Sequence, residues 1–272
     1  MRIVTWNVNS LAARLPRVLS WLVTAQPDVL CLQETKLAQD AFPFEAVAEL
    51  GYTAAHRGQG QWNGIAVLSR IGLEVVAEDI PGVPGFPMPD GLVEARFLHA
   101  RCGQTVGAEV DVVNVYVPNG RGVDDPHYAY KLAWLEALRA DVTQFAGRSN
   151  PYAVLGDYNV APTDADVWDP AVFIGSTHVT PAERQALAGL RNTGLIDIVP
   201  TIAKGPHPYT FWDYRGGNFH KQMGMRIDLI YANPAFANAV TAAEVDREAR
   251  KPGVKGTPAP SDHAPVVVDL TF

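Results

Sequence analysis

The chain has 272 residues, of which 47% are hydrophobic, and its formal net charge is −7. It is long enough to bury a full core, and it contains no uninterrupted apolar stretch of about 18 residues, the length that suggests a membrane-spanning helix. The negative charge argues against a broad basic surface for nucleic acid, although carboxylates that hold a divalent cation would add to the same negative count.

Short runs of β-branched, aromatic and other apolar residues predict strands, and several are continuous runs typical of strands buried on both faces. In chain order these strands cover residues 3–6, 29–32, 52–55, 64–68, 93–98, 110–117, 152–155, 227–231 and 266–270. Three- and four-residue periodicity predicts helices over 15–25, 44–50, 128–145 and 182–191. Thr180 is the expected N-cap of the last helix, with Pro181 at its first position. Helices that cover buried strands indicate a layered α/β protein.

We expect one domain over residues 1–272. The segment 81–90 is rich in proline and glycine, but apolar periodicity resumes directly after it, so it indicates a loop and not a linker. The chain begins with a predicted strand, not with a basic leader followed by an apolar signal core. Cytoplasmic residence is therefore expected.

Acidic residues stand at the ends of predicted strands in distant parts of the sequence. Glu34 and Asp157 follow strands, Asp228 lies near the start of one, and Asp262 precedes the last strand. Polar residues at several strand ends are how an open sheet assembles one active site on its rim. A single such carboxylate would usually cap a helix or lie on the surface. Their repetition favours a site for a hard cation such as Mg²⁺ or Mn²⁺, which prefers oxygen ligands.

His263 follows Asp262 directly and precedes the apolar segment that begins the last strand. A single histidine is more often a buried structural residue than a catalytic one. Asp228, however, is flanked by apolar residues, and a buried carboxylate needs a partner. An aspartate that accepts a hydrogen bond from one ring nitrogen fixes the tautomer and supports the cationic form of the imidazole. We therefore expect Asp228 and His263 to form a pair.

Two pairs of polar residues, Asn7 with Asn9 and Asp157 with Asn159, are spaced two residues apart. On an extended backbone this spacing places both side chains on one side of the sheet, although a turn would produce the second pair equally well. Tyr116 closes the apolar run over 110–117. A tyrosine at the end of a strand is more often a packing residue, but its hydroxyl could donate a hydrogen bond to a phosphate.

In chain order, these segments resemble the exonuclease III family of apurinic/apyrimidinic endonucleases. The segments are Asn7, Leu32-Gln33-Glu34-Thr35-Lys36, Tyr116-Val117-Pro118-Asn119, Gly156-Asp157-Tyr158-Asn159, Arg226-Ile227-Asp228 and Ser261-Asp262-His263. Each is modest evidence alone, but together they are highly specific and run over essentially the whole chain. The resemblance implies a four-layer α/β sandwich, in which two packed mixed sheets are flanked by helices, and a single catalytic domain.

The resemblance also implies a metal site. Glu34 would be the principal ligand, with Asn9 and Asp262 nearby and Asn7 holding the phosphate or the surroundings of the metal. Asp157 and Asn159 complete the implied set. The implied cofactor is Mg²⁺, with Mn²⁺ as a substitute, acting as a Lewis acid on a phosphoryl oxygen.

Catalytic roles follow from the same resemblance. Asp157 would handle the attacking water or the leaving group, and Asn159 would orient it. His263, paired with Asp228, would contact the scissile phosphate and stabilise the charge of the transition state. Tyr116 would help to bind that phosphate.

Substrate choice would depend on Asn119, Arg121, Phe211, Trp212, Met225 and Ile227. In the family, the positions of Phe211, Trp212, Met225 and Ile227 form an apolar pocket. This pocket admits a flipped sugar without its base, whereas an intact nucleotide does not fit. Phe211 and Ile227 could equally be core residues. Some relatives have an aromatic residue at the position of Met225, which leaves the balance between incision at abasic sites and trimming of 3′ ends open.

The leading hypothesis is a monomeric, Mg²⁺-dependent DNA repair nuclease that acts on double-stranded DNA with abasic sites or blocked 3′ ends and has no membrane partner. A phosphodiesterase or phosphatase of the same superfamily that acts on a small molecule or a lipid is the first alternative. A catalytically dead DNA-binding module is the second, but it would have lost at least one catalytic acid. Two basic clusters could contact DNA: Arg215, His220, Lys221 and Arg226, and Arg247, Arg250, Lys251 and Lys255. Solvated loop charges explain the second cluster equally well.

Overall fold

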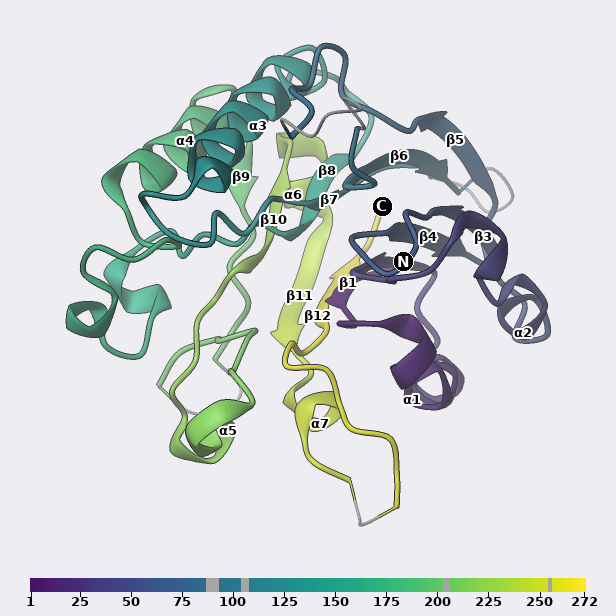
Figure 1. Cartoon of the computed structure of the whole chain (residues 1–272). Coiled ribbons are helices and arrows are strands. Elements are labelled where there is room, and N and C mark those ends of the chain that lie inside the picture. Colours follow the sequence, from purple (N-terminus) through teal and green to yellow (C-terminus); the bar gives the residue numbers. More distant parts are fainter. Residues whose placement is uncertain (87–92, 104–107, 203–205, 254–255) are drawn as a thin grey trace.

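The computed structural model describes residues 1–86, 93–103, 108–202, 206–253 and 256–272. Within these residues the chain forms two six-stranded sheets that pack against each other, with helices on their outer faces (Figure 1). Both sheets are mixed. The predicted four-layer α/β sandwich is confirmed.

The two sheets are built from segments spread over the whole chain. From edge to edge, the first sheet consists of β11 (Val240–Val245), β12 (Val266–Leu270), β1 (Arg2–Asn7), β2 (Val29–Gln33), β4 (Ile65–Ser69) and β3 (Thr53–Arg57). The second consists of β5 (Leu73–Ala77), β6 (Phe97–Cys102), β7 (Val110–Tyr116), β8 (Tyr152–Asp157), β10 (Asp228–Ala232) and β9 (Ile196–Asp197). Only β1–β2 and β7–β8 are parallel among the strand pairs described.

Helices lie on both outer faces of the sandwich and also in the connections at its edges (Figure 1). They are α1 (Leu11–Ala25), α2 (Phe44–Ala48), α3 (Pro126–Val142), α4 (Pro181–Asn192), α5 (Asn218–Lys221), α6 (Pro234–Ala239) and α7 (Arg247–Arg250). Helix α1 packs on the first sheet, and α3 and α4 pack side by side on the second (Figure 1). Thr180 is the N-cap of α4 and Pro181 its first residue, as predicted, and Thr180 also forms a capping box with Glu183.

Successive residues of the central strands are buried on opposite faces. Val29 and Cys31 belong to the core between the sheets, whereas Leu30 and Leu32 pack against α1. Both faces of β2 are therefore apolar, which explains why its sequence is a continuous apolar run and not an alternating one.

The two largest differences between a predicted and an observed starting residue, at α1 and β6, arise from long-range hydrogen bonds. Helix α1 begins at Leu11 and not at residue 15, since the backbone amides of Ser10 and Leu11 donate to the carbonyls of Glu34 and Thr35 at 2.8 and 2.9 Å. Strand β6 begins at residue 97 and not at 93, because the backbone of residues 93–95 forms hydrogen bonds with the 57–64 segment instead of with a neighbouring strand. Residues 87–90 of the predicted loop over 81–90 lie outside the described residues.

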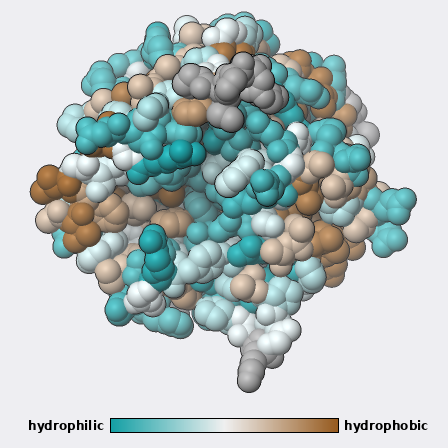
Figure 2. Space-filling model, in the orientation of Figure 1, coloured by the Kyte–Doolittle hydropathy of each residue, from teal (hydrophilic) through white to brown (hydrophobic). Residues whose placement is uncertain are grey.

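No helix in the described part of the chain is both long and apolar enough to cross a membrane. On the face of the molecule shown in Figure 2, hydrophilic side chains predominate and hydrophobic ones form separate patches.

Candidate active site

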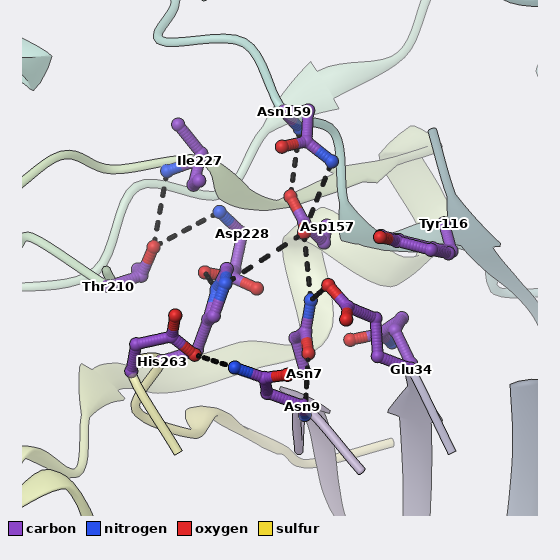
Figure 3. A network of polar contacts seen from close by, with 12 residues as sticks. Asn7, Asn9, Glu34, Tyr116, Asp157, Asn159, Thr210, Ile227, Asp228 and His263 are labelled. Carbon is purple, nitrogen blue, oxygen red and sulfur yellow. Dashed lines mark hydrogen bonds and ion pairs between the residues drawn. The ribbon is translucent and has the colours of Figure 1, made fainter. Parts of the chain in front are cut away.

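The predicted site residues meet where strands of the two sheets end (Figure 3). Asn7 is the last residue of β1, and Glu34 follows the neighbouring strand β2, with which β1 runs parallel. In the other sheet, Asp157 ends β8 and is paired in register with Asp228, which begins the antiparallel strand β10. The strand-end pattern of the sequence thus becomes one compact group of polar side chains.

Asn7 joins the two sheets across the site. Its completely buried side-chain amide donates to Glu34 Oε1 and to Asp157 Oδ2, both at 2.9 Å. Its Oδ1 accepts a hydrogen bond from the backbone amide of Asn9 at 2.9 Å. Because the Asn7 side chain is held at both ends, it fixes the distance between the two carboxylates.

Glu34, Asn9 and Asp262 form a group of oxygen atoms suited to a hard cation. Asn9 Nδ2 donates to Asp262 Oδ1 at 3.0 Å, while Lys36 Nζ lies 2.7 Å from Glu34 Oε2 and 2.6 Å from Asn9 Oδ1. Burial opposes the ionisation of Glu34, but Lys36 and the hydrogen bond from Asn7 lower its pKa. An ionised carboxylate and an amide oxygen that already lie against a positive charge have the chemistry of ligands for a divalent cation.

His263 lies on the opposite side of this group. Its Nδ1 is 2.8 Å from Asp228 Oδ2, which confirms the predicted pair, and its Nε2 is 4.0 Å from Asp157 Oδ2. Ligand atoms of these three residues lie within 4.8 Å of one another, a second arrangement that could hold a metal ion. Protonation of the imidazole would compete with a metal there.

The pKa values of Asp157 and His263 are displaced in a way that suits proton transfer. Burial is the main reason why the pKa of Asp157 is raised to about 7; Asp228 adds to the shift and His263 opposes it. For His263, burial acts to lower the pKa, but the charge and hydrogen bond of Asp228 outweigh it and raise the pKa to about 10. At neutral pH the imidazole is therefore a cation beside a carboxyl group that is close to its midpoint.

Asp228→Asn is expected to bring the pKa of His263 from about 10 down toward its ordinary value of 6.5, because the paired negative charge is lost. Since the folded-state pKa lies above the unfolded one, the stability that the pair contributes is complete below pH 6.5 and is lost as the pH rises through about 10. A titration of the His263 ring nitrogens by NMR in the metal-free protein measures the shift. Asp111→Asn is the control, because Asp111 is also a buried carboxylate but pairs with Arg101. If His263 still titrated near pH 10 in Asp228→Asn, Asp228 would not be the cause of its raised pKa.

Asp157 is held by the residues next to it in sequence. Its Oδ1 accepts a hydrogen bond from the backbone amide of Asn159 at 2.8 Å, and its Oδ2 accepts one from Asn159 Nδ2 at 3.3 Å. Asn119 Nδ2 in turn donates to Asn159 Oδ1 at 3.0 Å. Gly156 is required in this motif, because a Cβ atom there would lie 1.9 Å from the carbonyl oxygen of Val115 in the adjacent strand.

Tyr116 and Arg121 take different positions at the rim. The partly buried ring of Tyr116 points its hydroxyl into the site (Figure 3), and the guanidinium of Arg96 lies 4.6 Å from the centre of the ring. Arg121 is exposed, and its backbone amide donates to Asn119 Oδ1 at 3.1 Å. Arg121 is thus available to a ligand that approaches this rim, whereas Tyr116 is within the site.

The predicted apolar pocket is only partly present at the surface. Phe211 is half-buried, with its ring 4.9 Å from the ring of His263, and it packs with Met225 and Ile227, which are 6% and 2% exposed. Trp212 is completely buried in a different cluster. Phe211 is therefore the member of this group that can contact a substrate directly, while Met225 and Ile227 support it and Trp212 lies apart.

Two residues of the site were not singled out from the sequence. Thr210 Oγ1 accepts hydrogen bonds from the backbone amides of Ile227 and Asp228, both at 3.1 Å, and so holds the start of β10 (Figure 3). Lys36 belongs to a matched segment, and its spacing of two residues from Glu34 was a signal for their contact. No pattern in the sequence marks Thr210.

The basic clusters contribute fewer surface charges than the sequence indicates. Arg226 is buried in ion pairs with Asp166 and Asp197, and Arg250 is also buried. Lys255 lies outside the described residues. Of the remaining basic residues in the two clusters, His220 and Lys251 are exposed and line a hollow of about 390 Å³ beside α5 and α7.

Comparison with known proteins agrees with this geometry. The Endonuclease/Exonuclease/phosphatase family model matches residues 4–263. The chain is 28% identical to exodeoxyribonuclease III of Haemophilus influenzae over 98% of both proteins. Its structure resembles a 3′-5′ exonuclease from Neisseria meningitidis (TM-score 0.84, 36% identity) and an AP endonuclease from Archaeoglobus fulgidus (TM-score 0.86, 31% identity), with 100% of each chain covered.

Proposed function

Because the chain belongs to the endonuclease/exonuclease/phosphatase family and to its exonuclease III branch, we propose that it is a Mg²⁺-dependent DNA repair nuclease. It would hydrolyse phosphodiesters on the 5′ side of abasic sites and remove blocking groups from 3′ ends of double-stranded DNA. Residues 1–272 would form one catalytic domain, active as a monomer. The names of the relatives, an exodeoxyribonuclease III and an AP endonuclease, support this choice of substrate.

The observation that carries the proposal is the bridge made by Asn7. This side chain connects Glu34, on the side suited to a cation, with Asp157, on the side of the Asp228–His263 pair. A phosphate between the two sides would meet a positive charge from each. Phosphoryl transfer depends mainly on such positioning and electrostatic stabilisation, because charge spreads over the phosphate oxygens in the transition state.

Each side of the site would have its own task. A bound divalent cation would polarise a phosphoryl oxygen as a Lewis acid. His263 carries its Nδ1 proton toward Asp228, so the Nε2 proton of the imidazolium is free to be donated to a phosphate oxygen. Asp157, whose pKa is about 7, would accept a proton from the attacking water while Asn159 keeps the carboxylate oriented.

The proposal is tested with an end-labelled DNA duplex that carries one stable abasic analogue. The protein is assayed with Mg²⁺ and with EDTA, beside an intact duplex and a duplex with a 3′ phosphate. We expect Mg²⁺-dependent cleavage on the 5′ side of the lesion and release of the 3′ phosphate. A folded protein that cuts none of these substrates with added metal, but hydrolyses a small phosphomonoester or diester, would instead be a phosphatase of the same superfamily.

Phe211→Ala is expected to change the ratio of abasic-site incision to 3′-phosphate release by about tenfold, because a contact in an apolar pocket contributes on that scale to discrimination. Met225→Ala should change the same ratio less, since only 6% of Met225 is exposed. Both rates are measured on the two labelled duplexes, with Val172→Ala, an exposed residue outside this cluster, as the control. An unchanged ratio in Phe211→Ala would mean that Phe211 only packs against its neighbours and does not select the substrate.

A further inference from the structure

A buried lysine lies directly behind the loops that carry two of the predicted site residues. Lys131 is in α3 and its side chain is 0% exposed. Its Nζ donates to the backbone carbonyl of Asn159 at 2.7 Å and to that of Asn119 at 3.2 Å. The carbonyls of both asparagines thus point to one ammonium group.

Glu183 balances the charge of this lysine. Its Oε1 lies 2.5 Å from Lys131 Nζ and also accepts hydrogen bonds from Thr177 Oγ1 and the backbone amide of His178. Its Oε2 completes the capping box with Thr180 at the start of α4. Both carboxylate oxygens of Glu183 therefore have partners within the protein, and the Lys131–Glu183 pair links α3 to the first turn of α4.

Each of the two loops contains a residue with a positive φ angle next to the lysine. Asn159 has φ 50° and Gly120 has φ 90°, both in the left-handed region that most residues avoid. A Cβ atom on Gly120 would lie 2.7 Å from Thr177 Oγ1 and 3.1 Å from Lys131 Cδ, so the loop is packed tightly onto the lysine. Held in this way, Asn159 presents its backbone amide and its side chain to Asp157.

We propose that Lys131 is a positioning residue for the reaction. Its ammonium group binds one backbone carbonyl of the Asn119 loop and one of the Asn159 loop, and so holds the two loops together. Through Asn159 it fixes the direction of the Asp157 carboxylate. Lys131 itself does not touch the substrate. This inference rests on the proposed nuclease function and adds a residue that none of the sequence motifs contains.

Stability alone does not account for a buried ion pair at this position. Taking both charges out of water is unfavourable, and replacing a buried pair with neutral groups of similar volume is often neutral or stabilising. What an apolar side chain cannot replace is a donor that reaches both carbonyl oxygens. Thr177 Oγ1 contacts the carbonyl of Asn119, and His178 Nδ1 contacts that of Asn159. Among the described residues, Lys131 alone donates to both.

The test compares Lys131→Met with the double variant Lys131→Met/Glu183→Gln. The single variant leaves an uncompensated buried carboxylate, so we expect a lower Tm. In the double variant glutamine keeps the capping-box role and much of the Tm returns, but kcat should stay about ten- to hundredfold below that of the wild type, because Asp157 is misplaced. KM for DNA should change little. Leu138→Ala, two turns further along α3 in the core, is the control for lost stability without lost positioning.

A double variant with the kcat of the wild type would overturn the proposal, as would a kcat that simply follows Tm through all variants, Leu138→Ala included. Hydrogen exchange gives a readout that does not depend on activity. Peptides over 117–121 and 157–161 should lose protection in the double variant while those over β7 and β8 keep it. If wild-type protein cuts no DNA, the proposed function fails, and unchanged exchange in these two segments would separately overturn the positioning role.

Discussion

Asp157→Asn is expected to lower kcat by about 10²- to 10⁴-fold, the range associated with removal of a general base, with little change in KM for DNA. Asparagine keeps the shape of the side chain but cannot accept the proton. Folding should not suffer. The folded-state pKa of Asp157, about 7, lies above its ordinary value of 3.8, so the wild type loses stability as the pH rises through about 7. Above pH 7 the variant should therefore be at least as stable as the wild type.

Single-turnover cleavage and thermal unfolding at pH 8 measure these two effects together. Asp111→Asn is a matched control, because Asp111 is also a buried carboxylate of the second sheet but pairs with Arg101, at the opposite end of β7 from Tyr116. It should alter Tm and leave kcat close to that of the wild type. A kcat in Asp157→Asn within a few-fold of the wild type would remove Asp157 from the chemistry.

Glu34→Gln is expected to raise the Mg²⁺ concentration needed for half-maximal activity by at least about ten- to hundredfold. A change of that size already follows when a residue that only supports a metal ligand is replaced, and Glu34 is expected to be a ligand itself. The change removes the carboxylate that pairs with Lys36 and accepts a hydrogen bond from Asn7. Cleavage rate as a function of Mg²⁺, and binding of uncleaved DNA in EDTA, are the two measurements. DNA binding without metal should be nearly unchanged.

Glu136→Gln serves as the control for Glu34→Gln. Glu136 also forms an ion pair, with Arg139, but on the exposed surface of α3. Its removal should leave the metal dependence as it is. The same Mg²⁺ titration curve for Glu34→Gln and the wild type would mean that the metal is held elsewhere, for example by the group of Asp157, Asp228 and His263.

The fold was predicted best where a strand is buried on both sides. β1, β2, β4, β7, β8, β10 and β12 consist mostly of buried residues, the majority of them apolar, and all were predicted close to their observed positions. The strands that the sequence did not indicate are β5, β9 and β11, each at an edge of its sheet. An edge strand has one neighbour and much exposed surface, as in Leu73–Ala77 with its three exposed central residues, so its composition carries little signal.

The arrangement of the site followed the sequence for polar groups more closely than for apolar ones. Glu34, Asn7, Asp157 and the Asp228–His263 pair come together as their strand-end positions indicate. Apolar residues carry no such direction, since a side chain such as Trp212 suits a pocket wall or a core equally well. Its complete burial became evident only from the packing around it.

The sequence by itself determined the layered α/β class, the family, and the identity of the polar groups at the strand ends, because the apolar pattern of a strand and the chemistry of a side chain can be read from the residues themselves. Only the tertiary structure decided how those groups face one another: Asn7 reaches Asp157 across 150 positions of sequence, and Lys131 reaches Asn159 and Glu183 from a helix that no motif marks. Distances and pKa values in a site depend on which segments pack together, and that packing is set by the entire core.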